Sequence, residues 1–422
     1  MSVDVITLGC RLNAYESDVI RARAEEAGLE DAVVVNTCAV TGEAVRQSRQ
    51  EIRKLRREHP AAKIIVTGCA AQIEPGLFGA MPEVDLVLGN QEKLSTASYR
   101  PDIFADTQRV LVNDIGLARE TAPQFISGFS GRTRAILQVQ NGCDHRCTFC
   151  IIPYGRGPSR SVGMGAIVEE TRRLCAAGYR EVVLSGVDLT DWGADLPGNP
   201  GLGALVQRLL RHVPELSRLR LSSIDPAEVD DLLLGLLGDE ERLMPHFHLS
   251  AQSGDNLILK RMKRRHTRED TIRFCETARK RRPQVAFGAD LIAGFPTETG
   301  DMFANTLRLI DDAGLVYLHV FPFSPRKGTP AAKMPQLGRA VVKDRARQLR
   351  EKGAAILSQR LAGLVGSNQE LLVEDACTAR TPCFASARLD APSSPGTLLR
   401  ACIEASDGRN LHARVLNAAQ SW

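Results

Sequence analysis

The segment 141-NGCDHRCTFCIIPYGRG-157 places three cysteines, Cys143, Cys147 and Cys150, within eight residues. Their C-x3-C-x2-C spacing lets three thiolates of one loop reach a single soft metal centre. Structural zinc normally takes four closed ligands, often from two C-x2-C pairs, and this loop offers only three. Three cysteines could instead hold a [4Fe–4S] cluster with one iron open to a small molecule. A zinc knuckle or chance clustering is the competing interpretation.

A series of βα units surrounds this segment. Strand patterns fall at residues 135–140, 181–185, 218–221, 246–249, 285–291 and 316–321, with helical patterns between them, such as 165–177, 201–212 and 302–313. Six such units in about 200 residues predict a barrel or partial barrel of parallel strands. The cysteine motif follows the first of these strands, at the end where the active sites of such barrels lie.

The first 100 residues show a second run of strands and helices. Strands are predicted in "DVITLGC", "AVVVNTC", "KIIVTGC" and "VDLVLGN", and helices in "NAYESDVIRARAEEAGL" and "GEAVRQSRQEIRKLRREH". This alternation predicts a parallel α/β sandwich. Three strands run into a cysteine: Cys10, Cys38 and Cys69. Because the carboxyl ends of parallel strands meet at one edge, the three thiols can converge there. Buried structural cysteine is the alternative.

The composition and pattern of the sequence change at two places, which divide the chain into three parts. The segment "ETAPQFISGFSGRT", residues 120–133, is rich in Gly, Ser and Thr and is typical of a connector. From about residue 366, short segments broken by Pro, Gly and Ser predict a small all-β module of about 55 residues. We therefore predict three domains, at residues 1–115, 129–360 and 364–422, within the range expected for 422 residues.

Composition bounds the class of protein. The hydrophobic fraction of 43% and the charged fraction of 25% are ordinary for a globular protein. The start lacks the pattern of a signal peptide, and no run of about 18 apolar residues occurs, so we expect a cytoplasmic protein without membrane spans. In that compartment the 11 cysteines indicate metal binding or catalysis rather than disulfides.

Basic residues are clustered although the net charge is only +4. Residues 260–282 hold 11 Lys/Arg against three Asp/Glu, and residues 46–58 hold six against two. Such runs bind phosphates or are solvated helix faces. The candidate RNA-binding residues, which include two arginines after the cysteine motif, are Arg156, Arg160, Lys260, Arg264 and Arg265.

A C-x3-C-x2-C motif after the first strand of a partial barrel resembles the radical S-adenosylmethionine (SAM) superfamily. The resemblance implies that the open iron chelates SAM, which is cleaved to a 5′-deoxyadenosyl radical. Phe149 fits the aromatic residue common between the last two cysteines. Polar or small residues at the strand ends would contact SAM, although such residues are also common helix N-caps. These candidates are Gly186, Asp188, Ser223, Gln252 and Asp290.

Nearly the whole chain resembles the methylthiotransferase family. Members carry three cysteines for an auxiliary cluster in an N-terminal domain, a radical SAM core and a C-terminal β-barrel called TRAM. The segments "GCRLNAYES", "NTCAVT" and "NGCDHRCTFCIIPYGRG" look most like the branch that modifies threonylcarbamoyl-adenosine next to the tRNA anticodon. Departures are Ala70, where an aromatic is frequent, Thr297, where glycine is frequent, and a C-terminal module with five Arg, no Lys and six Asp/Glu.

The resemblance implies a chemistry and its partners. The radical abstracts hydrogen from C2 of the adenine, sulfur on the auxiliary cluster bonds to that carbon, and a second SAM supplies the methyl group. The cofactors are two [4Fe–4S] clusters and SAM, both vacant irons face one cavity, and no residue is expected as acid or base. The base must enter unstacked. We expect tRNA and an electron donor of flavodoxin or ferredoxin type as partners, with the sulfur donor unidentified.

Other interpretations remain open at this point. A sister enzyme modifies an aspartate of a ribosomal protein, and another branch acts on isopentenyl-adenosine in tRNA. A non-catalytic iron–sulfur electron carrier or a zinc-stabilised RNA-binding protein would share some of the cysteines. His145 is expected to be a loop residue rather than a ligand. The cysteines outside the two sets of three are expected to be structural.

Overall fold

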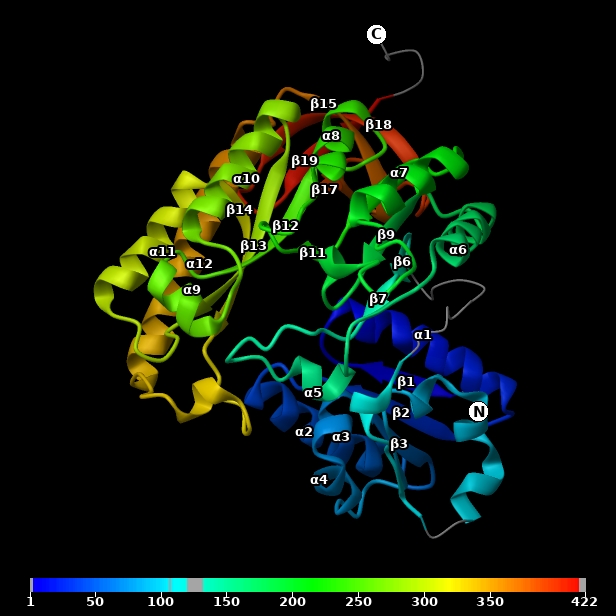
Figure 1. Ribbon diagram of the computed structural model, residues 1–422. Helices are drawn as coiled ribbons and strands as arrows, with labels where there is room; N and C mark the ends of the chain where they lie inside the picture. Colours follow the sequence, from blue (N-terminus) through cyan, green and yellow to red (C-terminus); the bar gives the residue numbers. More distant parts are fainter. Residues whose placement is uncertain (1–2, 106–107, 120–131, 417–422) are drawn as a thin grey trace.

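The computed structural model describes residues 3–105, 108–119 and 132–416. Most of the predicted connector at 120–133 lies outside the described residues, as do the predicted domain start at residue 129 and the chain ends at 1–2 and 417–422. In Figure 1 an N-terminal sheet (blue and cyan), a larger barrel-like region (green and yellow) and a C-terminal β region (orange to red) follow one another along the chain.

The N-terminal region is a parallel sheet in the order β1-β2-β3-β4-β5, as predicted except for its last strand. Alternate residues of β2 enter different cores: Val33 and Val35 pack with α2, whereas Val34 packs with α1. The sheet is therefore covered on both faces. Its strands are β1 (Asp4–Thr7), β2 (Ala32–Thr37), β3 (Lys63–Gly68), β4 (Leu86–Leu88) and β5 (Val110–Leu111), and its helices are α1 (Arg11–Glu26), α2 (Gly42–Glu58), α3 (Cys69–Ile73) and α4 (Pro75–Gly79).

The central region confirms the predicted partial barrel of parallel strands. The ladders β6-β9-β10 and β11-β12-β13-β14 follow sequence order, and only Ser222 separates β10 from β11. No ladder joins β6 to β14 within the described residues, so the barrel is open between them. The strands are β6 (Arg134–Gln138), β9 (Glu181–Ser185), β10 (Arg218–Leu221), β11 (Ser223–Ile224), β12 (His246–Gln252), β13 (Ala286–Ala293) and β14 (Leu315–Pro322).

Helices cover the outside of this barrel and share one large apolar core with its strands (Figure 1). A short antiparallel pair, β7 (Gln140–Asn141) and β8 (Arg160–Ser161), brackets the cysteine loop. The helices are α5 (Ile152–Arg156), α6 (Met164–Ala176), α7 (Leu202–His212), α8 (Asp231–Asp239), α9 (Asn256–Met262), α10 (Arg268–Arg281), α11 (Gly300–Asp312) and α12 (Arg339–Ala362).

The C-terminal region is the predicted small all-β module, a closed barrel in the order β15-β16-β17-β19-β18. The loop after β16 packs against the starts of the central strands. Tyr317 Oη donates to the Cys383 carbonyl at 3.1 Å, and the Phe384 ring stacks on His246 at 4.6 Å. The module thus closes the amino end of the partial barrel. Its strands are β15 (Asn368–Asp375), β16 (Thr378–Arg380), β17 (Ser386–Leu389), β18 (Leu398–Ser406) and β19 (Leu411–Val415).

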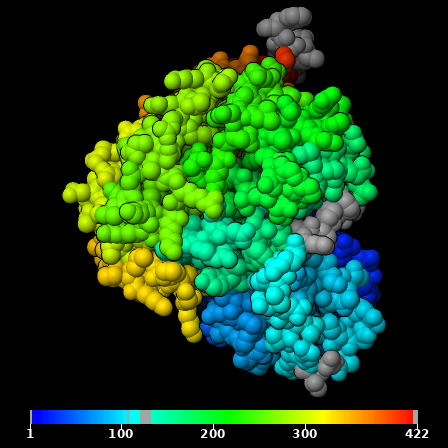
Figure 2. All heavy atoms as spheres, in the orientation of Figure 1, coloured from blue at the N-terminus to red at the C-terminus, as the bar shows by residue number. Residues whose placement is uncertain are grey.

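In the space-filling view, the teal atoms of the chain lie between the blue and cyan atoms of the N-terminal region and the green atoms of the central region (Figure 2). None of the helices in the described part of the chain is both long enough and apolar enough to cross a bilayer.

Candidate active site

Cys143, Cys147 and Cys150, here called the loop triplet, lie on a loop with a well-defined backbone. The Cys143 amide donates to the Gly157 carbonyl at 3.1 Å, and the Cys150 amide donates to the Cys147 carbonyl at 3.1 Å. Thr148 ties the loop to the end of α9: its amide donates to Met262 at 3.0 Å and its hydroxyl donates to the Arg261 carbonyl at 2.8 Å. The three thiols are therefore positioned by local backbone contacts.

Polar side chains surround the loop triplet. Cys143 Sγ lies 3.3 Å from Asp188, and Arg264 Nη1 donates to Cys147 Sγ at 3.5 Å. His145 Nε2 lies 2.8 Å from the same Asp188 carboxylate. Burial raises the pKa of Cys150 to about 12, with the Cys147 sulfur adding to the effect. Burial thus favours the protonated form of Cys150, and a metal that binds its thiolate must displace that proton.

Cys10, Cys38 and Cys69, here called the N-terminal triplet, come from the ends of β1, β2 and β3. Because β1, β2 and β3 are adjacent parallel strands, the three cysteines lie at one edge of the sheet, and a Cβ at Gly9 would lie only 2.9 Å from Cys38 Sγ. Burial raises the pKa of Cys38 to about 11, and the sulfurs of Cys69 and Cys10 add to the rise. Gly9 has φ of +103°, so only glycine allows this close approach without strain.

A buried ion-pair network supports the N-terminal triplet. Arg156, at the end of α5, donates from Nε to Cys69 Sγ at 3.1 Å and from Nη2 to Asn13 Oδ1 at 2.7 Å. It also pairs with Glu16, which accepts a 2.7 Å bond from Lys93. Burial alone would raise the pKa of Glu16, but the two cations outweigh it and lower the pKa. The segment that begins in the loop triplet therefore ends against the N-terminal triplet.

The spacing of the sulfurs suits a cluster better than a single ion. Among the described residues, the groups of three possible ligands whose atoms all lie within 4.8 Å are His248, Asp290 and His319, and His145, Asp188 and Glu228. In neither cysteine triplet do all three sulfur atoms lie within 4.8 Å of one another. A [4Fe–4S] cluster is larger than one ion and is bound by cysteine thiolates on separate irons, so wider spacing fits it. Three thiols in each triplet are the donor set that such a cluster takes.

A cavity of about 470 Å³ lies beside the N-terminal triplet. Cys10 lines it together with Ile136 of β6 and Val183 of β9, and Glu374 of the C-terminal module closes one side. All three regions of the fold thus meet at one chamber inside the partial barrel. Charged side chains, among them Arg134 and Glu374, line the interior here, unlike the packed apolar centre of a complete barrel.

Of the predicted SAM-binding residues, Gly186, Asp188 and Gln252 lie at or just after the ends of barrel strands. A Cβ on Gly186 would lie 2.8 Å from Gln140 Oε1, the same oxygen that accepts the Asp188 amide at 2.9 Å. Gln252 ends β12 with φ of +64°, an uncommon conformation for this residue type. Phe149 packs against the apolar cluster that contains Phe295, and Ser223 is paired with His248 in the β11–β12 ladder.

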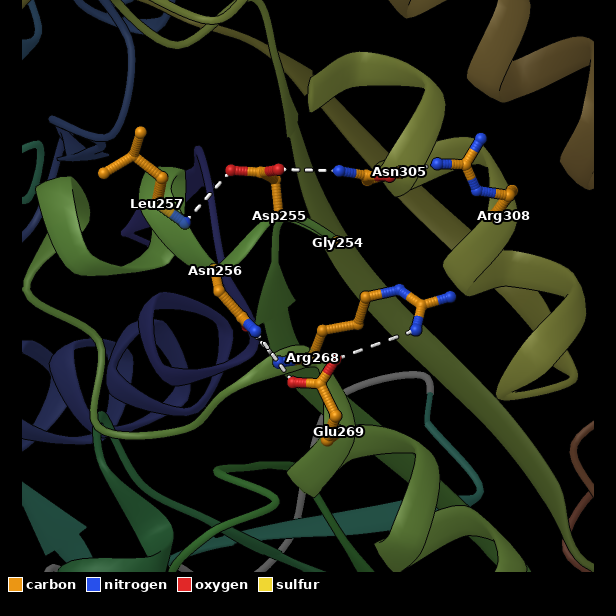
Figure 3. A pocket seen from close by; sticks show the side chains of 8 residues that line it. All are labelled: Gly254, Asp255, Asn256, Leu257, Arg268, Glu269, Asn305 and Arg308. Carbon is orange, nitrogen blue, oxygen red and sulfur yellow. Dashed lines mark hydrogen bonds and ion pairs between the residues drawn. The ribbon is translucent and has the colours of Figure 1, made fainter. Parts of the chain in front are cut away.

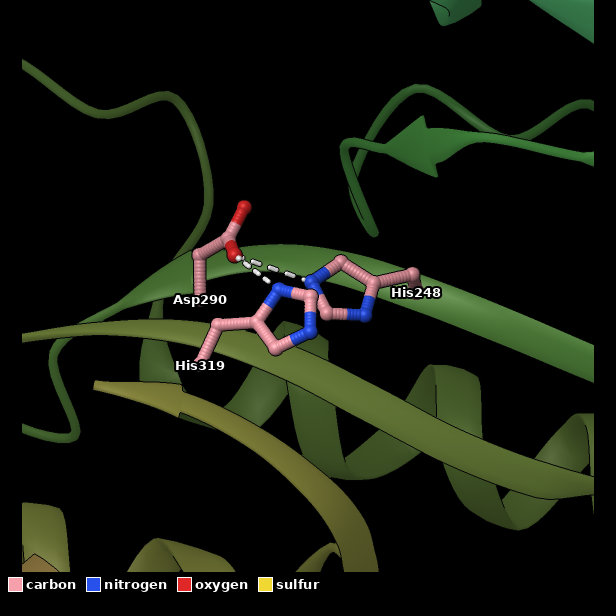
Figure 4. A group of neighbouring side chains, drawn as sticks. All are labelled: His248, Asp290 and His319. Carbon is pink, nitrogen blue, oxygen red and sulfur yellow. Dashed lines mark hydrogen bonds and ion pairs between the residues drawn. The ribbon is translucent and has the colours of Figure 1, made fainter. Parts of the chain in front are cut away.

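Asp290 lies within strand β13, in the wall of the barrel, and two histidines lie next to its carboxylate (Figure 4). His248 Nε2 lies 2.9 Å from its carboxylate and His319 Nδ1 lies 3.3 Å from it. Burial would raise the pKa of Asp290, but its bonds to the two histidines outweigh burial and lower the pKa. Sequence reasoning missed both histidines. Residues two positions apart on a strand share a face, and each histidine lies two positions from another residue that faces the barrel interior.

The five predicted RNA-binding residues have different surroundings. Arg156 and Arg160 are buried, and the Arg156 donors are engaged inside the fold, so the geometry speaks against their contact with RNA. Arg264 pairs with Asp225 at 2.6 Å next to the loop triplet. Arg265 is exposed and pairs with Glu228, and Lys260 is exposed on α9.

A separate hollow of about 360 Å³ lies on the outer surface between α9, α10 and α11 (Figure 3). Its polar groups bind one another: Asn305 donates to Asp255 at 2.7 Å, and Asn256 donates to Glu269 at 2.8 Å. Their mutual pairing leaves little polar capacity for a ligand, and we assign no function to it.

Two family models match the regions that carry the two triplets. The Radical SAM superfamily matches residues 137–310, and a family described as Uncharacterized protein family UPF0004 matches residues 2–89. Among solved structures, the radical SAM methyltransferase TsrM of Kitasatospora setae aligns with a TM-score of 0.53 and 15% identity, over 88% of this chain and 81% of that one. That likeness concerns the fold alone. The barrel and its loop triplet therefore define a radical SAM protein.

Curated relatives narrow the class further. The chain is 52% identical to the threonylcarbamoyladenosine tRNA methylthiotransferase MtaB of Rickettsia prowazekii, over 94% of each chain. It is 37% identical to the protein of that name from Bacillus subtilis, over 78% of this chain and 74% of that one. A tRNA-2-methylthio-N(6)-dimethylallyladenosine synthase of Erythrobacter litoralis is 34% identical over 88% of this chain and 86% of its own. The chain belongs to the threonylcarbamoyladenosine tRNA methylthiotransferase family.

Proposed function

We propose that this chain is a radical SAM enzyme that methylthiolates C2 of N6-threonylcarbamoyladenosine next to the anticodon in tRNA. The observation that carries the proposal is the 52% identity, over 94% of the chain, to a relative named for this activity. The relative named for dimethylallyladenosine is only 34% identical, which favours the main proposal over that substrate.

The six cysteines of the two triplets form two separate cluster sites. Cys143, Cys147 and Cys150 hold one [4Fe–4S] cluster, and Cys10, Cys38 and Cys69 hold the other. Bound with SAM, these clusters supply the radical and sulfur chemistry that an unactivated aromatic C–H bond requires. The fit rests on the two sets of thiols and on the chamber that Cys10 lines. Phe149, Gly186, Asp188, Ser223, Gln252 and Asp290 form the proposed SAM-binding set.

The chain's own side chains position these groups. Arg156 donates to Cys69 and Arg264 donates to Cys147, so each triplet receives one guanidinium that stabilises thiolate charge. The C-terminal module closes the amino end of the barrel and keeps water from entering there. Exposed cations on α9 and after it, Lys260 and Arg265, are the remaining candidates for contact with tRNA phosphates.

The partners follow from this chemistry. The tRNA supplies the unstacked base, and a flavodoxin- or ferredoxin-type protein supplies electrons. We infer a cytoplasmic location, because that is where tRNA is modified and where free thiols persist.

The test is mass spectrometry of nucleosides from tRNA of a strain that lacks this gene. We expect the 2-methylthio derivative of threonylcarbamoyladenosine to disappear and threonylcarbamoyladenosine itself to accumulate. Plasmid-borne wild-type protein should restore the product, and a Cys69→Ala variant should not. Persistence of the methylthio nucleoside in the deletion strain would contradict the proposal.

A matched measurement separates the remaining candidates. The same digests report the methylthio derivative of isopentenyl-adenosine, and a tryptic digest of the ribosome reports a methylthio-aspartate. Loss of either product, with the threonylcarbamoyladenosine derivative intact, would assign the enzyme to that substrate instead.

A further inference from the structure

Arg11 directly follows Cys10, and none of the acidic groups in the described part of the chain lies within ion-pair distance of it. It lines the chamber beside Cys10, and its guanidinium carbon lies 5.9 Å from the centre of the Phe384 ring. Its side chain forms no hydrogen bond or ion pair with any residue that the structure describes. The Arg11 side chain is partly buried, so it is shielded from much of the water that would otherwise solvate its charge.

The two other arginines that line the chamber are paired, Arg132 with Asp18 at 3.1 Å and Arg134 with Glu374 at 2.8 Å, and the acidic groups nearby are also engaged. Glu181 pairs with Arg220 and Glu374 pairs with both Arg134 and Arg380, while Asp290 is bound by its two histidines. Arg218 pairs with Glu370 at 3.1 Å. The carboxylates near Arg11 are therefore engaged by other cations, Glu374 by two arginines at once, so the surroundings of Arg11 carry an excess of positive charge. A half-buried cation of this kind is stabilised by an anion that enters with the ligand.

We propose that Arg11 binds the carboxylate of the threonylcarbamoyl group and so selects this base over adenosines with neutral N6 groups. The inference rests on the proposed function. A threonine joined through its amino group keeps its carboxylate, which is ionised at neutral pH. A guanidinium binds a carboxylate through two parallel hydrogen bonds and can stack on an aromatic ring, here Phe384.

The position of Arg11 suits this role. Because it is the next residue after Cys10, the carboxylate would be bound beside the N-terminal triplet, where the proposed sulfur transfer to the base takes place. A base with an apolar N6 group would leave Arg11 unpaired, and a site built around a charged group discriminates strongly against a ligand that lacks it.

Two other anions could reach the chamber: an RNA phosphate and the carboxylate of SAM. The methyl ester of threonylcarbamoyladenosine separates these sources, because it removes the charge of the substrate carboxylate and leaves phosphates and SAM unchanged. Anticodon stem-loops carrying the acid, the ester or plain adenosine are therefore the probes.

Binding of these stem-loops to the full-length reconstituted protein is measured anaerobically by fluorescence anisotropy, alongside initial rates of methylthiolation. The wild type should prefer the acid over the ester by about ten- to hundredfold. Arg11→Gln should lose most of this preference through weaker binding of the acid alone, and Arg11→Lys should keep part of it. Arg23→Gln removes a partly exposed arginine of the same helix and should change neither value.

The outcomes are distinguishable. If Arg11→Gln retains the wild-type preference, the inference is wrong and the proposed function stands. Equal weakening for all three stem-loops would point to phosphate binding and also overturn it. If the wild type neither binds nor converts the acid form, the proposed function itself fails. Iron content and far-UV circular dichroism show whether each variant is folded.

Discussion

The loop triplet takes its three cysteines from eight consecutive residues, whereas the N-terminal triplet collects its cysteines from strand ends spread over residues 10–69. Thr148 ties the first to the end of α9, with its amide bonded to the Met262 carbonyl and its hydroxyl bonded to the Arg261 carbonyl. The second depends on a parallel sheet that must form before its thiols meet, and on Arg156, which comes from outside that sheet.

This difference shows two ways to build similar ligand sets. A triplet within one loop costs little conformational entropy, because few residues must be ordered relative to one another. A triplet made from distant strand ends needs the whole domain, yet it can face a chamber that a single loop could not reach. The arginine that serves the N-terminal triplet ends the segment that starts at the loop triplet, so folding of the two sites is linked.

Removal of one cysteine from each triplet is the strongest test of the comparison. Cys147→Ala and Cys69→Ala should each lower iron after anaerobic reconstitution from about eight to about four atoms per chain, and both should abolish methylthiolation. Only Cys147→Ala should also lose reductive cleavage of SAM, because the loop triplet is the proposed SAM site. Iron analysis and chromatography of 5′-deoxyadenosine measure the two effects.

Cys175→Ala is the matched control, since this half-buried cysteine of α6 lies outside both triplets. It should retain iron and both activities. Full iron content in Cys69→Ala would show that the N-terminal triplet does not hold a cluster, and the comparison between the two sites would then lose its basis.

The arginines give a second, smaller contrast. Arg156→Gln should destabilise the fold by about 2–3 kcal/mol, because it removes buried charged hydrogen bonds while Lys93 still neutralises Glu16. Arg264→Gln should cost about 1 kcal/mol, since Arg264 is less buried and His266 remains 3.1 Å from Asp225. Urea denaturation of the apoprotein compares the two variants.

Arg23→Gln breaks the Arg23–Glu26 pair on α1 and shows how far the urea midpoint falls when an arginine outside the buried network is lost. A midpoint for Arg156→Gln no lower than that of Arg264→Gln would mean that the buried network contributes little to the stability of the N-terminal triplet.

Sequence periodicity predicted most of the scaffold. The strands at 181–185 and 218–221 end where predicted, because each is a compact, buried run with clear boundaries. β5 was missed because two residues carry no detectable pattern. The convergence of Cys10, Cys38 and Cys69 followed from the rule that ends of parallel strands share an edge.

The polar networks were beyond sequence reasoning for a physical reason. The Glu16–Arg156 pair joins residues separated by 140 positions, and no spacing rule relates them. Arg156 was predicted to contact RNA because its type and place suit phosphate binding, whereas its burial depends on how α5 docks. The same holds for Phe384, whose place beside His246 depends on the docking of the C-terminal module.

The smallest effect concerns support of the loop triplet at Thr297. This β-branched residue has φ of +67°, a strained conformation, and its hydroxyl accepts a 2.8 Å bond from Arg261. Asparagine tolerates this conformation better and keeps an acceptor. Thr297→Asn should therefore raise the melting temperature by about 1–2 °C, corresponding to less than about 1 kcal/mol.

Thr299→Asn is the control, because this N-cap of α11 has an ordinary φ of −82° and asparagine caps helices well. It should leave the melting temperature nearly unchanged in differential scanning fluorimetry. A lower value for Thr297→Asn than for Thr299→Asn would mean that the threonine methyl group or its exact hydroxyl geometry outweighs the backbone strain. The Arg261 carbonyl accepts a hydrogen bond from the Thr148 hydroxyl, so that result would also connect the Thr297 side chain to the order of the loop triplet. The loop triplet would then depend on distant contacts more than its short spacing implies.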